Sequence, residues 1–264
     1  MKKFQLLAVM GLGLMNLSPA NSQTQDAKPT TEQIPMITSA AGLSSLVTIS
    51  DGYLQKMADI LKVTADNADV RSATWDRVRT PLQEAAKLNV EALNWFALPD
   101  GTYWSTQNGR EERNLSDRAY FRKVMAGQTV LGELVVSKAT GKSIAIVAVP
   151  VYGKDQAVVG VLGASIYLDK LSERIGREMG LNENIIYYSF NSNPTLGLVW
   201  DPSLIMVNPK SLGEEVSAAF DQMLSQTEGV QSYSFRGRKR TVVFRKSDVT
   251  GWWYAFGVVK TQSS

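Results

Sequence analysis

The chain has 264 residues, of which 44% are hydrophobic and 20% charged, a composition typical of a globular protein. It contains no Cys and no His, which excludes disulfides, thiolate metal sites, thiol nucleophiles and Ser-His-Asp triads. The net charge of +3 includes Lys2 and Lys3, so the chain without residues 1–22 carries +1 and gives no reason to expect nucleic acid as a partner.

Residues 1–22 have the pattern of a secretory signal peptide. Lys2 and Lys3 precede a mostly apolar stretch that is shorter than the ~20 residues of a membrane-spanning helix. Small residues follow, and cleavage is expected after Ala20 or Ser22. We therefore expect a periplasmic or secreted protein without a transmembrane helix in the mature chain. An uncleaved membrane anchor is the alternative.

Polar residues 23–36, which include Pro29 and Pro35, are predicted to form a linker. Apolar residues then recur at helical spacing from Leu43 to Leu61, and they predict a long helix over 38–66. A second helical stretch follows and contains Pro81, which indicates two short helices or one kinked helix.

Beyond residue 90 the pattern changes to short apolar runs separated by turns, which favours antiparallel strands. The first unit has strands at 92–97, 102–105, 130–136, 143–151 and 157–168, a polar loop at 107–116 and a short helix at 115–126. After a helix at 169–183, a smaller unit has strands at 185–190, 195–199, 232–235, 241–244 and 252–259 and a helix at 212–224. The order predicts an α+β fold with a duplicated arrangement.

Two features of the second unit carry further expectations. The basic cluster Arg236, Arg238, Lys239 and Arg240 surrounds a Gly-containing turn and is interpreted as a solvated hairpin tip. In the Trp252–Trp253 pair, alternation along a strand places one indole in the core and the other partly in solvent.

Residues 98–171 carry a resemblance to a known family. They contain a Pro-Asp-Gly turn, LSDRAYF, VSKATGK, VAVPV and VVGVLGASIYLDKL, in that order. This segment resembles the membrane-distal module of double Cache domains, which are extracytoplasmic sensors related to the PAS fold. The resemblance implies a long N-terminal helix followed by two PAS-like antiparallel-sheet modules. The N-terminal helices and the distal-type module would occupy 37–178, and a smaller proximal-type module would occupy 179–264.

The resemblance also implies a function. The chain is expected to be a free-standing exported sensor module, and not an enzyme, that binds an organic acid or an amino-acid-like metabolite and uses no metal or cofactor. A membrane sensor kinase or chemoreceptor would be its partner in signal transduction or chemotaxis. The alternatives are an exported enzyme and an adaptor protein that use the same fold without sensing a ligand.

The family binds its ligand against the distal sheet, beneath the short helix. Arg118, Tyr120 and Phe121 match an Arg and an aromatic pair of the amino-acid-binding subgroup, while Ser165 stands where that subgroup has Asp. Arg118 would pair with a carboxylate, and Ser165 offers no charge to an ammonium group. A small carboxylate without a required α-amine is therefore expected. The alternative role for Arg118 is a surface ion pair with an acid such as Asp117.

Three further residues are expected near the ligand. Trp104 is assigned to a wall of the pocket, while Trp95 and Tyr103 on the same hairpin are assigned to the core. Ser137 and Lys138 end a strand just before a turn, and Lys138 would add a second positive group or remain a solvated lysine.

Overall fold

The structure is a computed structural model that describes residues 33–259. The expected signal peptide at 1–22 lies outside the described residues. The first helix begins at Gln33, so the end of the expected linker at 23–36 is helical. Among the described residues, no helix is both long and apolar enough to cross a membrane.

Most elements follow the predicted order of helices and strands, and the structure adds a short helix at 68–71 and a strand at 109–114. The helices are α1 (Gln33–Ala65), α2 (Ala68–Arg71), α3 (Trp75–Ala86), α4 (Ala119–Met125), α5 (Leu168–Glu178) and α6 (Glu214–Leu224), with 3-10 turns η1 (Pro202–Leu204) and η2 (Pro209–Leu212). The strands are β1 (Ala92–Ala97), β2 (Thr102–Ser105), β3 (Gly109–Asn114), β4 (Val130–Val136), β5 (Ser143–Tyr152), β6 (Val158–Tyr167), β7 (Ile185–Phe190), β8 (Leu196–Val199), β9 (Glu228–Phe235), β10 (Arg238–Lys246) and β11 (Trp253–Val259).

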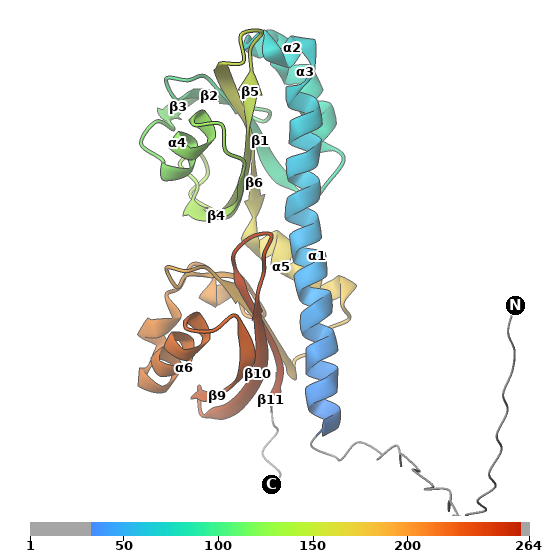
Figure 1. The fold of residues 1–264 in the computed structure, drawn as a ribbon, viewed down its shortest axis with the longest axis vertical. Coiled ribbons are helices and arrows are strands. Elements are labelled where there is room, and N and C mark those ends of the chain that lie inside the picture. Colours follow the sequence, from blue (N-terminus) through green and yellow to red (C-terminus); the bar gives the residue numbers. More distant parts are fainter. Residues whose placement is uncertain (1–32, 260–264) are drawn as a thin grey trace, which may run out of the picture.

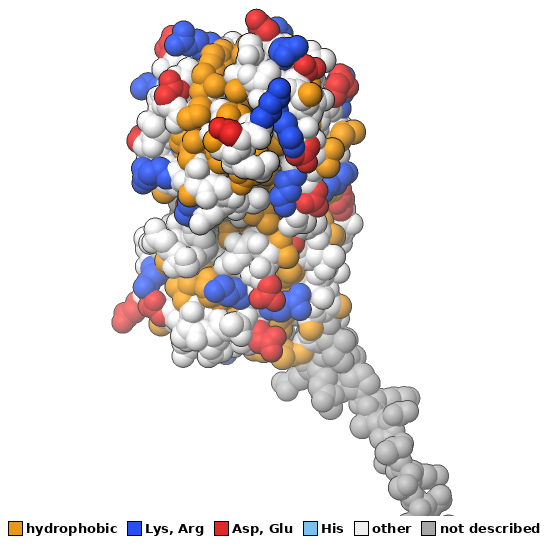
Figure 2. Space-filling model, turned by 45° about the horizontal axis from the view of Figure 1, so that its top comes forward, with side chains coloured by type: hydrophobic (Ala, Val, Ile, Leu, Met, Phe, Trp, Pro, Cys, Tyr) orange, Lys and Arg blue, Asp and Glu red, His pale blue; other side chains and the backbone are white. Residues whose placement is uncertain are grey.

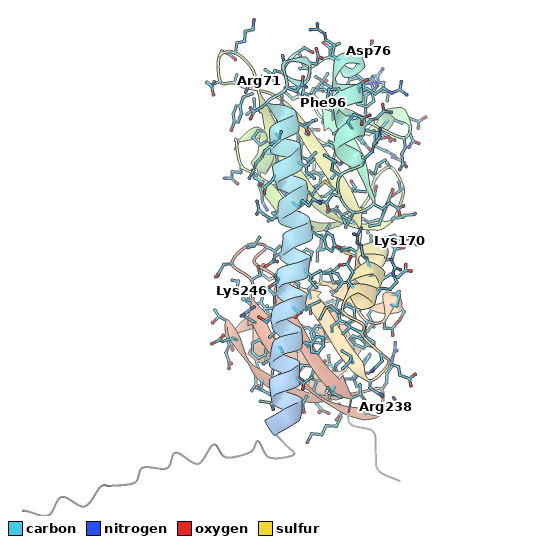
Figure 3. The ribbon with its side chains drawn as sticks, turned by 90° about the vertical axis from the view of Figure 1, so that its right-hand side faces the viewer. Arg71, Asp76, Phe96, Lys170, Arg238 and Lys246 are labelled. Atoms are coloured by element: carbon cyan, nitrogen blue, oxygen red, sulfur yellow. The ribbon has the colours of Figure 1, made fainter. Side chains whose placement is uncertain are left out.

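The strands form two antiparallel sheets that lie one above the other along α1 (Figure 1). The six-stranded sheet has the order β3-β2-β1-β6-β5-β4, and with α4 it forms the distal module. The five-stranded sheet has the order β8-β7-β11-β10-β9, and with α6 it forms the proximal module. Helix α5 connects the two, and Lys170 on this helix lies at the level between the sheets (Figure 3). The predicted α+β fold of one long helix and two sheet modules is confirmed.

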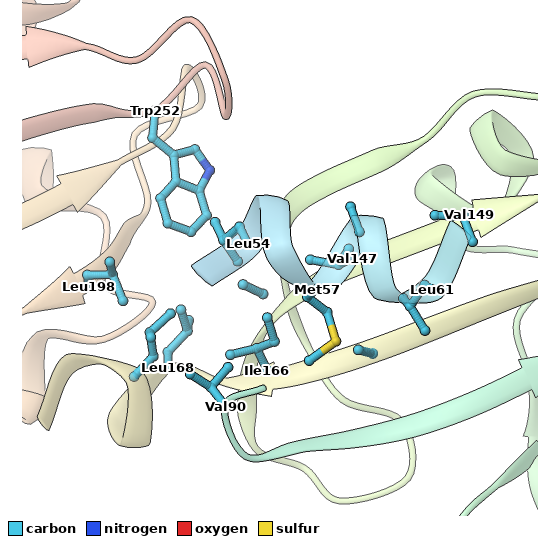
Figure 4. Close-up of a cluster of buried hydrophobic side chains, with 14 of the residues drawn as sticks. Leu54, Met57, Leu61, Val90, Val147, Val149, Ile166, Leu168, Leu198 and Trp252 are labelled. Carbon is cyan, nitrogen blue, oxygen red and sulfur yellow. The ribbon is translucent and has the colours of Figure 1, made fainter. Parts of the chain in front are cut away.

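Helix α1 holds the modules together through one apolar face. Leu46, Leu54, Met57 and Leu61 are almost fully buried, at the spacing of a single helical face. Figure 4 shows Met57 and Leu61 beside the distal sheet, while Leu54 lies next to Trp252 of the proximal module. One continuous core cluster therefore includes residues of both modules.

Strands β5 and β6 are neighbours in the interior of the distal sheet, and most of their residues are buried. Their sequences are continuous apolar runs because α1 covers one face of the sheet and α4 the other. Strand β3 was expected as a loop at 107–116. It pairs with β2 as a polar edge strand, and its exposed side chains leave no alternating apolar signal.

Two other expectations are corrected or decided by the structure. Trp252 and Trp253 are both buried, so the expectation that one faces solvent is wrong: the first joins the core along α1, and the second stacks on Phe190 beneath α6. Helix α3 is a single element that contains Pro81, instead of two short helices.

Candidate functional site

A small pocket lies on the face of the distal sheet that α4 covers. Its enclosed volume is about 20 Å³, which is room for roughly one water molecule. Strands β1, β2 and β6 form its floor, and α4 and the β4–β5 connection form its sides. The lining residues are Leu93, Trp95, Tyr103, Leu115, Arg118, Tyr120, Val135, Val136, Ser137, Lys138, Ala139, Ile144 and Ser165.

Trp95 forms the centre of the pocket floor. It faces Gly163 across the β1–β6 pair, and a Cβ at Gly163 would lie only 2.1 Å from the indole ring. The missing side chain at Gly163 therefore lets the indole lie flat on the sheet. The indole Nε1 donates a hydrogen bond to the Oγ of Ser165 at 3.1 Å. Ser165 thus lines the pocket and fixes the orientation of its largest aromatic ring.

The β1–β2 hairpin places Tyr103 in the pocket and Trp104 on the opposite face of the sheet. The register pairs Ala97 with Tyr103 and Phe96 with Trp104, and paired residues share a face. Trp104 stacks on Phe96 and on Trp75 of α3, on the side of the sheet that α1 and α3 cover. The expected assignment of Trp104 to the pocket is therefore wrong, whereas Trp95 and Tyr103 are buried in the core as expected and also line the pocket.

Arg118 lies at the mouth of the pocket, at the position that precedes the first turn of α4. Its side chain is partly buried, and Nη2 donates a hydrogen bond to the carbonyl of Val136 at 2.9 Å. Within residues 33–259, no carboxylate forms an ion pair with Arg118. The alternative role as a surface ion pair with Asp117 is not what the structure shows, because Asp117 has a different partner.

That partner is Lys138. Its Nζ lies 2.5 Å from Oδ1 of Asp117 and donates a second hydrogen bond to the carbonyl of Asn114 at 2.8 Å. The hydrogen bond from Lys138 holds the pKa of the Asp117 carboxyl below its usual value. Asp117 thus forms its ion pair with Lys138 and not with Arg118, although the nearby charge of Arg118 also helps to lower the pKa of Asp117. Ser137, the preceding residue, lines the pocket and is buried.

The two tyrosines of the pocket remain protonated near neutral pH. Burial and the nearby charge of Glu111 raise the pKa of Tyr103 to about 12, and burial raises the pKa of Tyr120 still further. Both hydroxyls are therefore available as hydrogen-bond donors. Phe121, the neighbour of Tyr120 on α4, does not line the pocket: it is buried in the core between α4 and the sheet.

The arrangement provides binding groups and lacks the usual pairs for proton transfer. No acidic residue lines the pocket in the part of the chain that the structure describes. Residues 33–259 also contain no group of acidic side chains placed to hold a metal ion. Arg118, Lys138 and the tyrosine hydroxyls can all act as hydrogen-bond donors, a set that suits an acceptor such as a carboxylate.

Figure 2 shows that acidic and basic side chains are interspersed over the face in view, with apolar groups between them. This face as a whole therefore carries no single sign of charge.

Comparison of the fold with solved structures gives several similar proteins. The ligand-binding domain of the Pseudomonas aeruginosa PAO1 amino acid chemoreceptor PctB, in complex with L-arginine, matches with a TM-score of 0.68 at 15% identity, over 87% of this chain and 96% of that one. The ligand-binding domain of the Pseudomonas fluorescens chemoreceptor CtaA, in complex with L-alanine, matches with a TM-score of 0.67 at 16% identity, over 87% and 99%.

The periplasmic sensory domain of the Campylobacter jejuni chemoreceptor Tlp1 also matches, with a TM-score of 0.65 at 12% identity, over 88% of this chain and 96% of that one. At these identities the structural likeness establishes the fold. A search of curated protein sequences gave no match. The family model described as Cache domain matches residues 26–264, nearly the whole chain. Together with the two sheet modules along α1, this match shows that the chain belongs to the double Cache domain family.

Proposed function

We propose that this protein is an extracytoplasmic sensor module that binds a small carboxylate in the pocket of the distal module. The observation that carries the proposal is the charge at the pocket mouth: Arg118 has no acidic partner among residues 33–259, while Lys138 is paired with Asp117. The guanidinium of Arg118 is therefore the positive group of the pocket that no ion pair occupies, which favours a monoanionic ligand. The guanidinium offers a planar fork of donors that matches the two oxygens of a carboxylate.

Residue Ser165 supports a ligand that needs no amino group. In the amino-acid-binding subgroup the corresponding position holds Asp, which pairs with the ligand's ammonium. Here the pocket lining contains no acid among the described residues, and Ser165 Oγ accepts the indole hydrogen bond from Trp95. Two of the structural neighbours named above are in complex with amino acids, L-arginine and L-alanine. The pocket of this chain is proposed to keep groups for the carboxylate of such a ligand and none for its ammonium group.

The pocket must open to admit such a ligand. Its volume of about 20 Å³ is far below the roughly 300 Å³ of typical ligand pockets. The hydrogen bond from Arg118 to the Val136 carbonyl ties α4 to the end of β4. A bound carboxylate would take this donor, releasing the end of β4 and the turn that follows it. Ligand binding would thereby change the structure next to the proximal module.

The location and the partner follow from the same proposal. The signal-like pattern at 1–22 and the membership in a sensor family support an extracytoplasmic location. A membrane sensor kinase or a chemoreceptor is the proposed recipient of the ligand state.

Thermal unfolding with matched ligands tests the proposal. Acetate, propionate, pyruvate and lactate would be compared with the corresponding amino acids and with ethylamine and propylamine. A ligand that binds only the folded state at 100 times its Kd adds about 2.7 kcal/mol to the stability. We expect the acids to raise Tm and the amines to leave it unchanged. Stabilisation by the amines alone would overturn the assignment.

Calorimetry on variants then locates the site. Arg118→Ala should weaken carboxylate binding about 10- to 100-fold, since a charge-assisted hydrogen bond contributes about 1.5–3 kcal/mol. Arg118→Lys should restore part of the affinity, because a point charge cannot form the fork. Arg122→Ala is the matched control: this exposed arginine lies on the same helix and does not line the pocket. Equal affinity of Arg118→Ala and wild type would show that the pocket is misassigned.

A further inference from the structure

The proximal module contains a buried arginine that the sequence pattern did not reveal. Arg240 was expected on a solvated hairpin tip, yet it is only 6% exposed. Side chains alternate along β10, and Arg240 shares its face with Val242 and Phe244, which pack in the core beneath α6. Arg238, at the outer end of the same strand (Figure 3), is exposed.

Arg240 has no counterion within residues 33–259. Its Nε and Nη1 atoms are buried and make no hydrogen bond. Arg236, in the turn of the same hairpin, instead forms an ion pair with Asp201 at 2.7 Å. A guanidinium stays charged even where burial lowers its pKa, as it does for Arg240. A buried and unpaired charge is costly, and this cost is relieved when an anion binds beside it.

Aromatic rings cover the guanidinium on its faces. Its central carbon lies 4.8 Å from the centre of the Trp200 ring and 4.9 Å from that of the Phe235 ring. Stacking of this kind leaves the N–H donors free in the plane of the guanidinium, where a carboxylate can accept two hydrogen bonds. Tyr233 faces Arg240 directly across the β9–β10 pair.

Trp200 and Phe235 also line a second small cavity, and they separate it from Arg240, which is not itself among the lining residues. Trp200, Phe235, Tyr188 and Tyr233 meet there with aliphatic side chains from η1, η2 and α6, and the enclosed volume is about 20 Å³. Tyr233 donates a hydrogen bond to the hydroxyl of Tyr188 at 3.0 Å. Burial raises the pKa of Tyr233 to about 12, so neither hydroxyl supplies a negative charge to Arg240 near neutral pH. The lining is otherwise apolar.

We propose that the proximal module has its own binding site, in which Arg240 pairs with the carboxylate of a small ligand whose apolar body enters the cavity between Trp200, Phe235 and η2. The ligand class is a short-chain aliphatic or aromatic monocarboxylate. The site is separate from the distal pocket and does not depend on Arg118. The 3-10 turns η1 and η2 border the cavity and would move apart to enlarge it.

The test uses butyrate and benzoate as probes, with butylamine and benzyl alcohol as matched compounds that lack the carboxylate. Binding is followed by calorimetry and by tryptophan fluorescence in the Arg118→Ala protein, whose distal pocket lacks its main anion-binding group. We expect the carboxylates to bind and the matched compounds to bind at least about tenfold more weakly. Failure of both carboxylates to bind this protein would overturn the proposal, whatever the distal pocket does.

Arg240→Met locates the second site, because Met fills similar space without a charge. It should reduce butyrate and benzoate affinity about 10- to 100-fold, while ligands of the distal pocket bind unchanged in a protein that retains Arg118. Without ligand, Arg240→Met should melt at a higher temperature than wild type, because an unpaired buried charge has been removed. Unchanged affinity for both probes would refute the assignment.

A measurement on the wild-type protein covers the case in which Arg240→Met does not fold. Arginine side-chain Nε–Hε signals would be recorded by NMR, with Arg240→Lys used to assign the signal of Arg240. Benzoate should shift this signal in wild type and in Arg118→Ala, and benzyl alcohol should not. A signal that stays in place while other arginine signals move would rule out the site.

Discussion

The indole Nε1 of Trp252 donates a hydrogen bond to the carbonyl oxygen of Gly132 over 3.1 Å, and this bond joins the proximal module to strand β4 of the distal module. Gly132 lies at a bulge in β4 and has a φ of +81°. A few residues further on, the same strand lines the distal pocket at Val135 and Val136. One strand therefore contacts both the pocket and the second module.

Gly132→Ala tests this contact. The new Cβ would lie 2.9 Å from the indole of Trp252 and would also force an alanine into a left-handed conformation. We expect a larger loss of stability than the ~1–2 kcal/mol of the conformational strain alone. Gly180→Ala is the control, since its φ is +61° and no atom lies near its Cβ position. Urea unfolding measures the loss of stability in each variant. Equal losses in Gly132→Ala and Gly180→Ala would show that the indole moves aside without cost.

The hairpin register predicts different effects for two neighbouring aromatic residues. Trp104→Ala removes a half-buried ring stacked on Trp75 and Phe96, and it should lower the free energy of unfolding by about 2–3 kcal/mol without changing carboxylate affinity. Tyr103→Phe removes a pocket hydroxyl and should weaken binding with little effect on stability. Denaturation and calorimetry on both variants check the pair, and a binding defect confined to Trp104→Ala would reverse the assignment.

Asp51 of α1 should make stability depend on pH. It accepts hydrogen bonds from Ser247, Thr250 and Tyr254 of the β10–β11 hairpin. Burial raises its pKa above the ordinary 3.8, and these hydrogen bonds offset part of the rise. Folding therefore favours the protonated form of Asp51. The stabilisation that this form adds to the free energy of unfolding is fully present below pH 3.8, and it is lost as the pH rises through the pKa of Asp51 in the folded protein.

Asp51→Asn should remove this dependence. The free energy of unfolding of wild type minus that of Asp51→Asn should fall as the pH rises above about 4, and then level off. Urea titrations of both proteins between pH 3.5 and 7.5 give the difference at each pH, so that other titrating groups cancel. A difference that grows with rising pH would mean that the hydroxyl hydrogen bonds outweigh burial.

Ser165→Asp should change the ligand class of the distal pocket. The carboxylate can keep the hydrogen bond from the Trp95 indole and adds a negative charge for a ligand ammonium group. We expect weaker binding of simple acids and measurable binding of the matched α-amino acids by calorimetry. Ser165→Asn, of the same size without the charge, should not gain amino-acid binding. If the two variants bind alike, the charge at this position does not select the ligand.

Much of the fold could be predicted from the sequence because its elements have strong patterns. The buried face of α1 and the apolar runs of β5 and β6 are long and unbroken. Strand β3 could not be predicted, because it lies at the sheet edge with polar residues on both faces. Its pairing with β2 is set by tertiary structure alone.

The side-chain face was harder to predict than the element. Alternation along β2 was recognised, but which residues face the pocket depends on how the strands pair, and Arg240 was assigned to a hairpin tip instead of a strand. The pairing of Tyr103 with Ala97 turns Tyr103 towards the pocket, and that of Arg240 with Tyr233 turns Arg240 towards the core. Short sequence motifs do not contain this register. By contrast, Arg118 and Tyr120 lie at the start of a short helix that the sequence pattern predicted, and the resemblance to Cache domains implied that they are near the ligand.

Helix α1 also determines how the molecule can be oriented on a surface. It rises roughly 50 Å over its 33 residues. Its first residue and the last described strand, β11, both lie at the proximal end (Figure 1). A protein immobilised through either end of this described region would present the distal pocket outwards, with the proximal cavity near the support. Immobilisation should therefore leave access of small acids to Arg118 unchanged, while crowding at the support would affect Arg240 first.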